Sequence, residues 1–169
     1  MPERETCTAI SSAFQPVKDL LEQGIQDGLH PGAQLCVALD GEVIADFAVG
    51  ESVVATGTSI TPDSAMPLFS SAKPITAVAI GVLADYGRLN FDDPVARHIP
   101  EFAARGKSNI QIKHLLNHTS GLAYDALADG GQSRAAVIAR LSDSHTIEGC
   151  IPGECSAYNP TTGWHILGE

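Results

Sequence analysis

Apolar positions recur at helical spacing between residues 14 and 29, and this pattern predicts an amphipathic helix. Two short apolar runs follow, over residues 34–39 and 42–49, with Asp40 and Gly41 between them. A type I′ turn needs positive φ angles at both central residues, which Asp and Gly adopt more readily than most. The pattern therefore predicts a helix followed by an antiparallel β-hairpin.

The most apolar stretch of the chain, residues 70–86, is apolar on nearly every side of a helix. Such a helix is expected to be buried against several neighbours. Pro74 is tolerated only in a first turn, where its missing N–H costs no hydrogen bond. The helix is therefore expected to begin near Ser70 or Ser71, both good N-cap residues, and to end at Gly87.

Weaker patterns complete the expected secondary structure. His30-Pro31-Gly32 is expected to stop the first helix, and a loop rich in Ser, Thr, Gly and Pro is expected from residue 50 to about 67. Residues 110–117 and 134–141 resemble short helices, and residues 164–169 resemble the start of another. Because so short a helix and a sheet of two strands are both unstable alone, these residues are expected to be part of a larger fold.

Composition excludes several classes of function. Twenty acidic against ten basic residues give a net charge of −10 without any basic run, so a nucleic-acid or anionic-membrane surface is not expected. No apolar stretch approaches the roughly 18 residues of a membrane span. The N-terminal sequence MPERE lacks a secretory signal pattern, which favours the cytoplasm. Reduced thiols are expected and a zinc site is not, because no C-x-x-C pair occurs among Cys7, Cys36, Cys150 and Cys155.

An S-x-x-K sequence, Ser70-Ser71-Ala72-Lys73, stands at the start of the apolar helix. Residues i and i+3 share one face of a helix, so the Ser70 hydroxyl and the Lys73 amine should lie close together. A lysine in partly apolar surroundings can accept the serine proton, and a helix N-terminus favours negative charge on the serine. The same residues could equally be a helix cap followed by a surface lysine.

Four blocks of sequence, in order, resemble the serine β-lactamase-like superfamily. The resemblance is greatest to its branch of class C β-lactamases, family VIII carboxylesterases and D-aminopeptidases, and it covers about residues 15–169. The blocks are the nucleophile segment MPLFSSAKPITA at 66–77, GRLNFDDPV with IPEF within 87–102, IKHLLNHTSGL at 112–122, and the tyrosine segment at 152–168.

The resemblance implies an α+β, β-lactamase-like fold, in which an antiparallel sheet flanked by helices joins a mainly helical region. This chain would be an incomplete N-terminal portion of that fold. Ser70 would be the nucleophile that forms an acyl-enzyme, and Lys73 its activating partner. Tyr158 would share the proton transfer with Lys73 as general base and later acid. A tyrosine needs the lysine charge nearby for this role, because its unperturbed pKa is about 10. The alternative for Tyr158 is a tyrosine at the core edge with a bonded hydroxyl.

Two departures from the family pattern bear on the substrate. The third position of the family's Y-x-N motif, often Asn, is Pro160, which offers no side-chain hydrogen bond for recognising a β-lactam. The family's third motif, K-T-G or a variant, is absent. The resemblance places it on a later strand that also supplies one oxyanion-hole N–H, the other being that of Ser70. His30-Pro31-Gly32 matches H-x-G literally but precedes the first strand.

The expected function is therefore a serine hydrolase or acyltransferase that forms an acyl-enzyme on an ester or amide. Esterase-like chemistry is favoured over β-lactam resistance, and no metal or organic cofactor is needed. The alternative is a non-catalytic scaffold or binding protein that retains the fold. Pro160 and the absent third motif favour that alternative.

The remaining polar candidates are weaker. His114 and His118 have the i, i+4 spacing of a metal pair but lack a third ligand, and the H-T-S-G-L context favours a structural, hydrogen-bonded His118. Ser120 lacks the G-x-S-x-G context of a nucleophile elbow. Asp92 and Asp93 precede a proline, so they are expected to form a turn rather than a catalytic carboxylate pair.

The resemblance also predicts how the chain is organised. Residues 1–65 would hold the N-terminal helix and hairpin, residues 66–150 a mainly helical region, and residues 151–169 the tyrosine segment and the start of a helix. The expected partners are a small-molecule ester or amide and a complementary C-terminal polypeptide segment or chain, with neither nucleic acid nor membrane. Alone, the chain is expected to be poorly soluble or molten and inactive.

Overall fold

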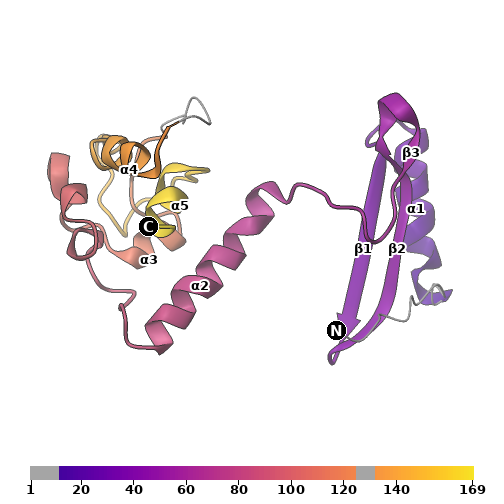
Figure 1. Ribbon diagram of the computed structural model, residues 1–169, viewed down its shortest axis with the longest axis horizontal. Coiled ribbons are helices and arrows are strands. Elements are labelled where there is room, and N and C mark those ends of the chain that lie inside the picture. Colours follow the sequence, from indigo (N-terminus) through magenta and orange to yellow (C-terminus); the bar gives the residue numbers. More distant parts are fainter. Residues whose placement is uncertain (1–11, 125–131) are drawn as a thin grey trace. The chain divides into compact units, whose positions relative to one another are not determined.

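The computed structural model describes residues 12–124 and 132–169, so Cys7 and the N-terminal MPERE lie outside the described residues. The chain divides into two compact units, unit 1 up to Pro67 and unit 2 from Leu68 to Glu169. Within the described ranges, no helix is both long and apolar enough to cross a bilayer. The elements in Figure 1 are α1 (Gln15–Gln26), β1 (Gly32–Leu39), β2 (Glu42–Val53), β3 (Thr58–Ser59), α2 (Lys73–Asp85), α3 (Ile112–Leu116), α4 (Arg134–Ser142) and α5 (Thr162–Leu167).

Short 3₁₀ helices, which the sequence patterns do not predict, join these elements. They lie mostly at turns, where a single tight turn suffices to reverse or redirect the chain. They are η1 (Ser12–Phe14), η2 (Val54–Thr56), η3 (Phe69–Ala72), η4 (Val95–Arg97) and η5 (Pro100–Gly106).

Unit 1 contains the predicted hairpin, with an added third strand. β1 and β2 pair antiparallel, and the turn residues Asp40 and Gly41 have φ angles of 50° and 87°. Alternate residues of β2 turn one face of the sheet towards α1, which covers it (Figure 1). β3, within the segment expected to be a loop, extends the sheet in the order β1-β2-β3. The buried residues of this core are Ala45, Phe47 and Val49.

The first helix ends earlier than the sequence suggests. α1 stops at Gln26, and Gly28 follows in the left-handed region at φ 72°. The N–H groups of Gly28 and Leu29 bond back to the carbonyls of Ile25 and Gly24. The glycine therefore closes the helix, as in many C-caps, before His30-Pro31-Gly32 is reached.

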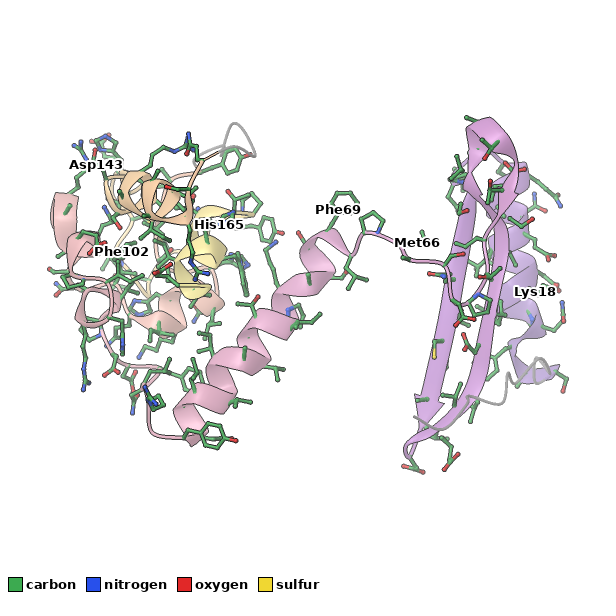
Figure 2. All side chains as sticks on the ribbon, in the orientation of Figure 1. Lys18, Met66, Phe69, Phe102, Asp143 and His165 are labelled. Atoms are coloured by element: carbon green, nitrogen blue, oxygen red, sulfur yellow. A yellow bond between two sulfur atoms is a disulfide. The ribbon has the colours of Figure 1, made fainter. Side chains whose placement is uncertain are left out.

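Unit 2 packs its helices and turns around a separate core. The segment after α2 is held to the start of α3 by backbone bonds from Val95 N to Ile110 O and from Ile112 N to Asp93 O. Phe102, labelled in Figure 2, is fully buried where η5 meets α4. The other buried residues of the unit 2 core are Ile80, Val95, Ile99, Ile110, Ile112, Leu115, Leu122, Ile138, Leu141, Ile166 and Leu167.

The apolar helix differs from the expectation in burial and in its start. Ile80 is buried and α2 packs against α5, but Ile75 and Val78 are 64% and 66% exposed within the described chain. The α-helix begins at Lys73, preceded by η3, and its N-cap is Ala72 without a side-chain bond. Neither Ser70 nor Ser71 is therefore the N-cap. Pro74 lies in the first turn, as its missing N–H requires.

A buried lysine joins η5 to the end of α4 and the turn that follows it. Lys107 is fully buried, and its Nζ donates to the carbonyls of Ala104, Ser142 and Ser144 at 2.9, 2.8 and 2.7 Å. Burial lowers the pKa of the Lys107 ammonium. Three carbonyls satisfy its three N–H donors, and Ser142 is the last residue of α4, where a cation also complements the helix dipole.

We expect Lys107→Met to lower the free energy of unfolding of the complete protein by at least about 2 kcal/mol, because it strands buried carbonyls without donors. Chemical denaturation measures the change. The matched control is Lys113→Met, which removes a lysine paired with Asp92 at an exposed site. That variant should lower the free energy of unfolding by less than about 1 kcal/mol. Equal effects from the two variants would contradict the role given to Lys107.

Candidate active site

The structure brings the three predicted site residues together within unit 2. Ser70 Oγ lies 2.6 Å from Tyr158 Oη, and Lys73 Nζ donates to Ser70 Oγ at 2.9 Å. These three residues are called the serine cluster below. Ser70 and Tyr158 are 88 positions apart in sequence, so the contact is a property of the fold. A hydroxyl bonded to both an amine and a phenol is arranged for proton transfer.

The 3₁₀ turn explains how Ser70 reaches Lys73. In a 3₁₀ helix the side chains at i and i+3 eclipse one another, and the Lys73 N–H bonds to the Ser70 carbonyl in this manner. Phe69, directly before Ser70, has a φ of 46°, a left-handed conformation that is rare for a bulky residue. The chain therefore turns sharply where the preceding segment becomes the helix that carries the cluster.

The surroundings of Tyr158 favour its phenolate form. Hydrogen bonds with Ser70 and then Lys73 lower the pKa of Tyr158, against a smaller opposing effect of desolvation, and the Lys73 charge adds to the lowering. The side chain is 59% exposed, so solvent screens these interactions. The direction of the shift is that required of a general base, since a lower pKa places more of the phenol in its proton-accepting form.

Two aromatic rings lie against the lysine. Lys73 Nζ is 5.5 Å from the centroid of the Tyr158 ring and 5.7 Å from that of Trp164 on α5. Cations are attracted to aromatic faces at such distances. Sequence reasoning did not identify Trp164 as part of the site. The pattern of residues 164–169 predicts only the start of an apolar helix, and nothing in it indicates that Trp164 faces Lys73.

The residue after Tyr158 serves the fold. Asn159 is buried, its Nδ2 donates to the carbonyls of Leu122 and Ala123, and its Oδ1 accepts from the N–H groups of Thr161 and Gly163. Its amide is thus fully used in fixing the start of α5. The Asn159 amide is therefore not available to bind a substrate. An Asn side chain at position 160 could bind one, but that position is Pro160.

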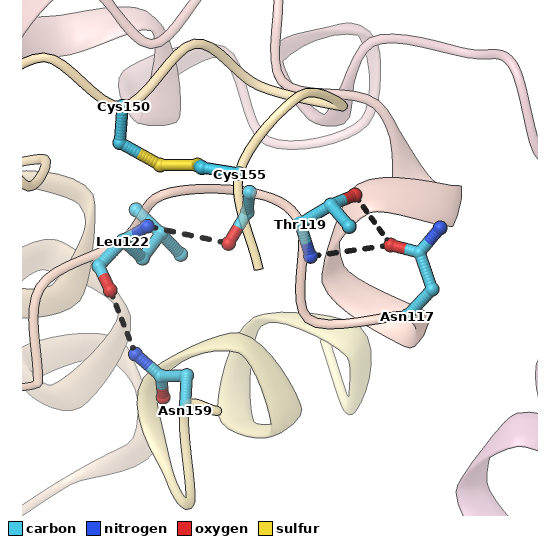
Figure 3. Close-up of a disulfide and its surroundings, with 7 residues drawn as sticks. Asn117, Thr119, Leu122, Cys150, Cys155 and Asn159 are labelled. Atoms are coloured by element: carbon cyan, nitrogen blue, oxygen red, sulfur yellow. Dashed lines mark hydrogen bonds between the residues drawn. A yellow bond between two sulfur atoms is a disulfide. The ribbon is translucent and has the colours of Figure 1, made fainter. Parts of the chain in front are cut away.

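The expectation of free thiols at Cys150 and Cys155 is wrong. The two form a disulfide across the loop that leads to Tyr158 (Figure 3). A Cβ added to Gly121 would lie 2.6 Å from Cys150 Sγ, so the disulfide packs directly on the backbone of the H-T-S-G-L segment. The spacing of the cysteines did not predict the disulfide, because only the fold brings the two ends of this loop together. Among the described residues, Cys36 is free and exposed.

The weaker candidates have structural roles. Among the described residues no group of His, Cys, Asp and Glu could hold a metal ion. Ser120 is buried and its Oγ accepts from the N–H of Leu122. Asp93 is buried against Arg97 and His98, whereas Asp92 pairs with Lys113, so the adjacent carboxylates have separate partners.

Comparison with known proteins identifies a family with this arrangement of motifs. The sequence profile of the Beta-lactamase family matches residues 17–169. Esterase/beta-lactamase LipL of Mycobacterium tuberculosis is 30% identical over 141 residues, which are 81% of this chain and 32% of LipL.

Two solved structures share the fold. A penicillin-binding protein homologue from Caulobacter crescentus has a TM-score of 0.79 at 30% identity, over 95% of this chain and 43% of that one. A family VIII carboxylesterase has a TM-score of 0.76 at 28% identity, over 94% of this chain and 43% of that one. The predicted β-lactamase-like fold class is thereby confirmed. The chain spans about a third of LipL and less than half of each solved chain.

We expect replacement of both Cys150 and Cys155 by Ser to lower the free energy of unfolding of the complete protein. The disulfide joins residues five positions apart, and closing so small a loop is worth about 2 kcal/mol on the chain-entropy account. Chemical denaturation under non-reducing conditions measures the loss, and a reducing agent should reproduce it in the unchanged protein. Cys36→Ser is the control and should have no effect. Stability that is insensitive to reduction would contradict this role.

Proposed function

Because the chain belongs to the Beta-lactamase family, we propose that it carries the nucleophile and general base of a serine hydrolase that forms an acyl-enzyme on an ester or amide. The observation that carries the proposal is the serine cluster. Ser70 Oγ has the Lys73 amine at 2.9 Å on one side and the Tyr158 phenol at 2.6 Å on the other.

The hydrogen bonds suggest the direction of proton transfer. In the proposed reaction the Lys73 ammonium donates to Ser70 Oγ, and the serine hydroxyl donates to the Tyr158 phenolate across the 2.6 Å contact. As Ser70 Oγ forms a bond to the substrate carbonyl carbon, its proton passes to the Tyr158 phenolate. The carbonyl oxygen becomes an oxyanion, stabilised by backbone N–H groups that include that of Ser70.

The same phenol then completes the reaction. When the tetrahedral intermediate collapses, the carbon–leaving group bond breaks and Tyr158 returns its proton to the departing alkoxide or amine. The acyl group remains on Ser70 Oγ as an ester. Water, or another alcohol in the case of acyl transfer, repeats the sequence at that ester and restores the free serine.

Two observations support an ester as the substrate. Pro160 has no side-chain group with which to bind the amide of a β-lactam antibiotic. One of the structural neighbours is a family VIII carboxylesterase, and LipL is named as both an esterase and a beta-lactamase. Esterase-like chemistry is therefore proposed over β-lactam resistance.

The activity is proposed to need a complementary polypeptide segment or chain. The apolar α2 has Ile75 64% and Val78 66% exposed, and Tyr158 of the serine cluster is 59% exposed. Water weakens every electrostatic contribution to the transition state, so an open cluster is a poor catalyst. The segment would cover α2, exclude water from Ser70 and supply the second oxyanion donor. The greater length of the relatives is consistent with this proposal.

A second candidate function is a non-catalytic scaffold or binding protein. The structure offers one observation in its favour, since Asn159 is fully used by backbone groups and Pro160 follows it. The tyrosine segment then has no amide free for a substrate. Covalent labelling separates the two candidates, because only a working nucleophile is acylated or phosphonylated.

We expect Ser70→Ala in the complete protein to abolish both p-nitrophenyl ester turnover and labelling by a fluorophosphonate probe. The matched control is Ser71→Ala, which removes the neighbouring exposed hydroxyl outside the serine cluster and should retain labelling. Retained labelling in the Ser70 variant would overturn the assignment of the nucleophile. Absence of labelling in the unchanged protein would favour the scaffold.

We expect residues 1–169 expressed alone to melt without cooperativity and to hydrolyse activated esters at the background rate. Addition of the complementary segment should restore a cooperative transition and ester hydrolysis together. A chain with Ser70→Ala is the control, because it should recover the transition without the activity. A monomeric fragment that melts cooperatively and turns over ester unaided would contradict the need for a partner.

A further inference from the structure

His118 holds the backbone on both sides of Tyr158. Its carbonyl accepts from the N–H of Ala157 at 3.0 Å, and its ring Nδ1 accepts from the N–H of Asn159 at 3.1 Å. Its ring also contacts the phenol ring, with 4.6 Å between centroids and planes tilted by 45°. One residue therefore fixes the segment before Tyr158, the segment after it and the orientation of its side chain.

The backbone of His118 is adapted to this role. Its φ is 60°, in the left-handed region that non-glycine residues seldom adopt. In this conformation the carbonyl and the ring of the same residue both reach the tyrosine segment. Nδ1 can accept a hydrogen bond only when it carries no proton, so the bond to Asn159 requires a neutral imidazole protonated at Nε2.

The surroundings of His118 favour that neutral form. Lys73 faces it from α2, Trp164 lies 5.7 Å from it on α5 by ring centroids, and Tyr158 faces it from the tyrosine segment. Burial and then the Lys73 charge lower the pKa of His118. Protonation would turn Nδ1 into a donor facing the Asn159 N–H, and would place a second positive charge near Lys73.

We propose that His118, in its neutral form, is a positioning residue that holds the Tyr158 phenol against Ser70. The proposal rests on the proposed function, in which Tyr158 takes the Ser70 proton. Proton transfer needs the phenol within hydrogen-bond reach of the serine, and a misplacement of about 1 Å can cost a hundredfold in rate. Activity should therefore disappear when His118 gains a proton, in addition to any loss from protonation of Tyr158 itself.

The decisive variants are His118→Asn and His118→Ala. Asparagine tolerates the left-handed backbone, and its amide oxygen can replace Nδ1 as the acceptor without titrating. Alanine removes the acceptor and the ring. The matched control is His114→Ala, since His114 Nδ1 likewise accepts from a backbone N–H, that of Gln111 at the start of α3.

Ester hydrolysis by the complete protein gives the first readout. We expect His118→Ala to lower kcat about a hundredfold with little change in KM, and His118→Asn to stay within about tenfold of the unchanged protein at pH 8. Below the His118 pKa, the unchanged protein should lose a further tenfold in kcat/KM per pH unit, and His118→Asn should not. The proposal falls if His118→Ala matches His114→Ala in kcat, or if His118→Asn keeps the extra acidic loss.

A second readout does not depend on turnover. With selective ¹⁵N labelling of asparagine, the backbone amide signal of Asn159 should shift as His118 titrates, and this titration should be absent from His118→Asn. If the amide titrates but Ser70→Ala still labels, the proposed function fails while the contact stands. If the amide shows no titration in the unchanged protein, the positioning role fails whatever the activity.

Discussion

The serine cluster depends on the pairing of two segments that flank α4. The H-T-S-G-L segment, residues 118–122, lies along the segment that leads to Tyr158. Backbone bonds join them from Ile147 N to Gly121 O, from Gly153 N to Thr119 O and from Ala157 N to His118 O. Ser70 lies on a different element, η3, and contributes none of these three bonds. The phenol therefore reaches the serine only if these loop backbones meet in one register.

Other features of unit 2 support that pairing. The Cys150–Cys155 disulfide closes the loop that contains Gly153, the donor of one of these bonds, and Gly121 provides the space into which the sulfur packs. Asn159 joins the end of the tyrosine segment to the carbonyl of Leu122 (Figure 3). Lys107 fixes the turn after α4 through the carbonyl of Ser144. Substitutions far from Ser70 can thus disturb the Ser70–Tyr158 contact by loosening the loops that carry Tyr158.

The sequence predicted features that are encoded locally. The Asp40-Gly41 turn, the two strands of the hairpin and the place of Pro74 in a first turn are each set by neighbours along the chain. The contact between Ser70 and Tyr158 was expected only through the family resemblance. No spacing rule joins residues so far apart, and the motif order supplied the missing three-dimensional information.

The sequence failed to predict features that depend on contacts between distant parts of the chain. The disulfide, the buried Lys107 and the Trp164 ring beside Lys73 all join residues from separate elements, and their sequence patterns resemble those of ordinary surface or core positions. The exposure of α2 was missed for another reason. An apolar helix indicates that burial is required, but it does not indicate which part of the polypeptide provides it.

The proposed function divides the reacting groups from the segments that would select a substrate. The proposed nucleophile, its amine partner and the proposed base all lie in unit 2, where hydrogen bonds within the unit fix them. Selection among esters would then come from segments packed over the cluster, and such segments can vary without disturbing the Ser70–Tyr158 contact. This division of roles gives a physical reason why one family includes proteins named as esterases and as penicillin-binding proteins.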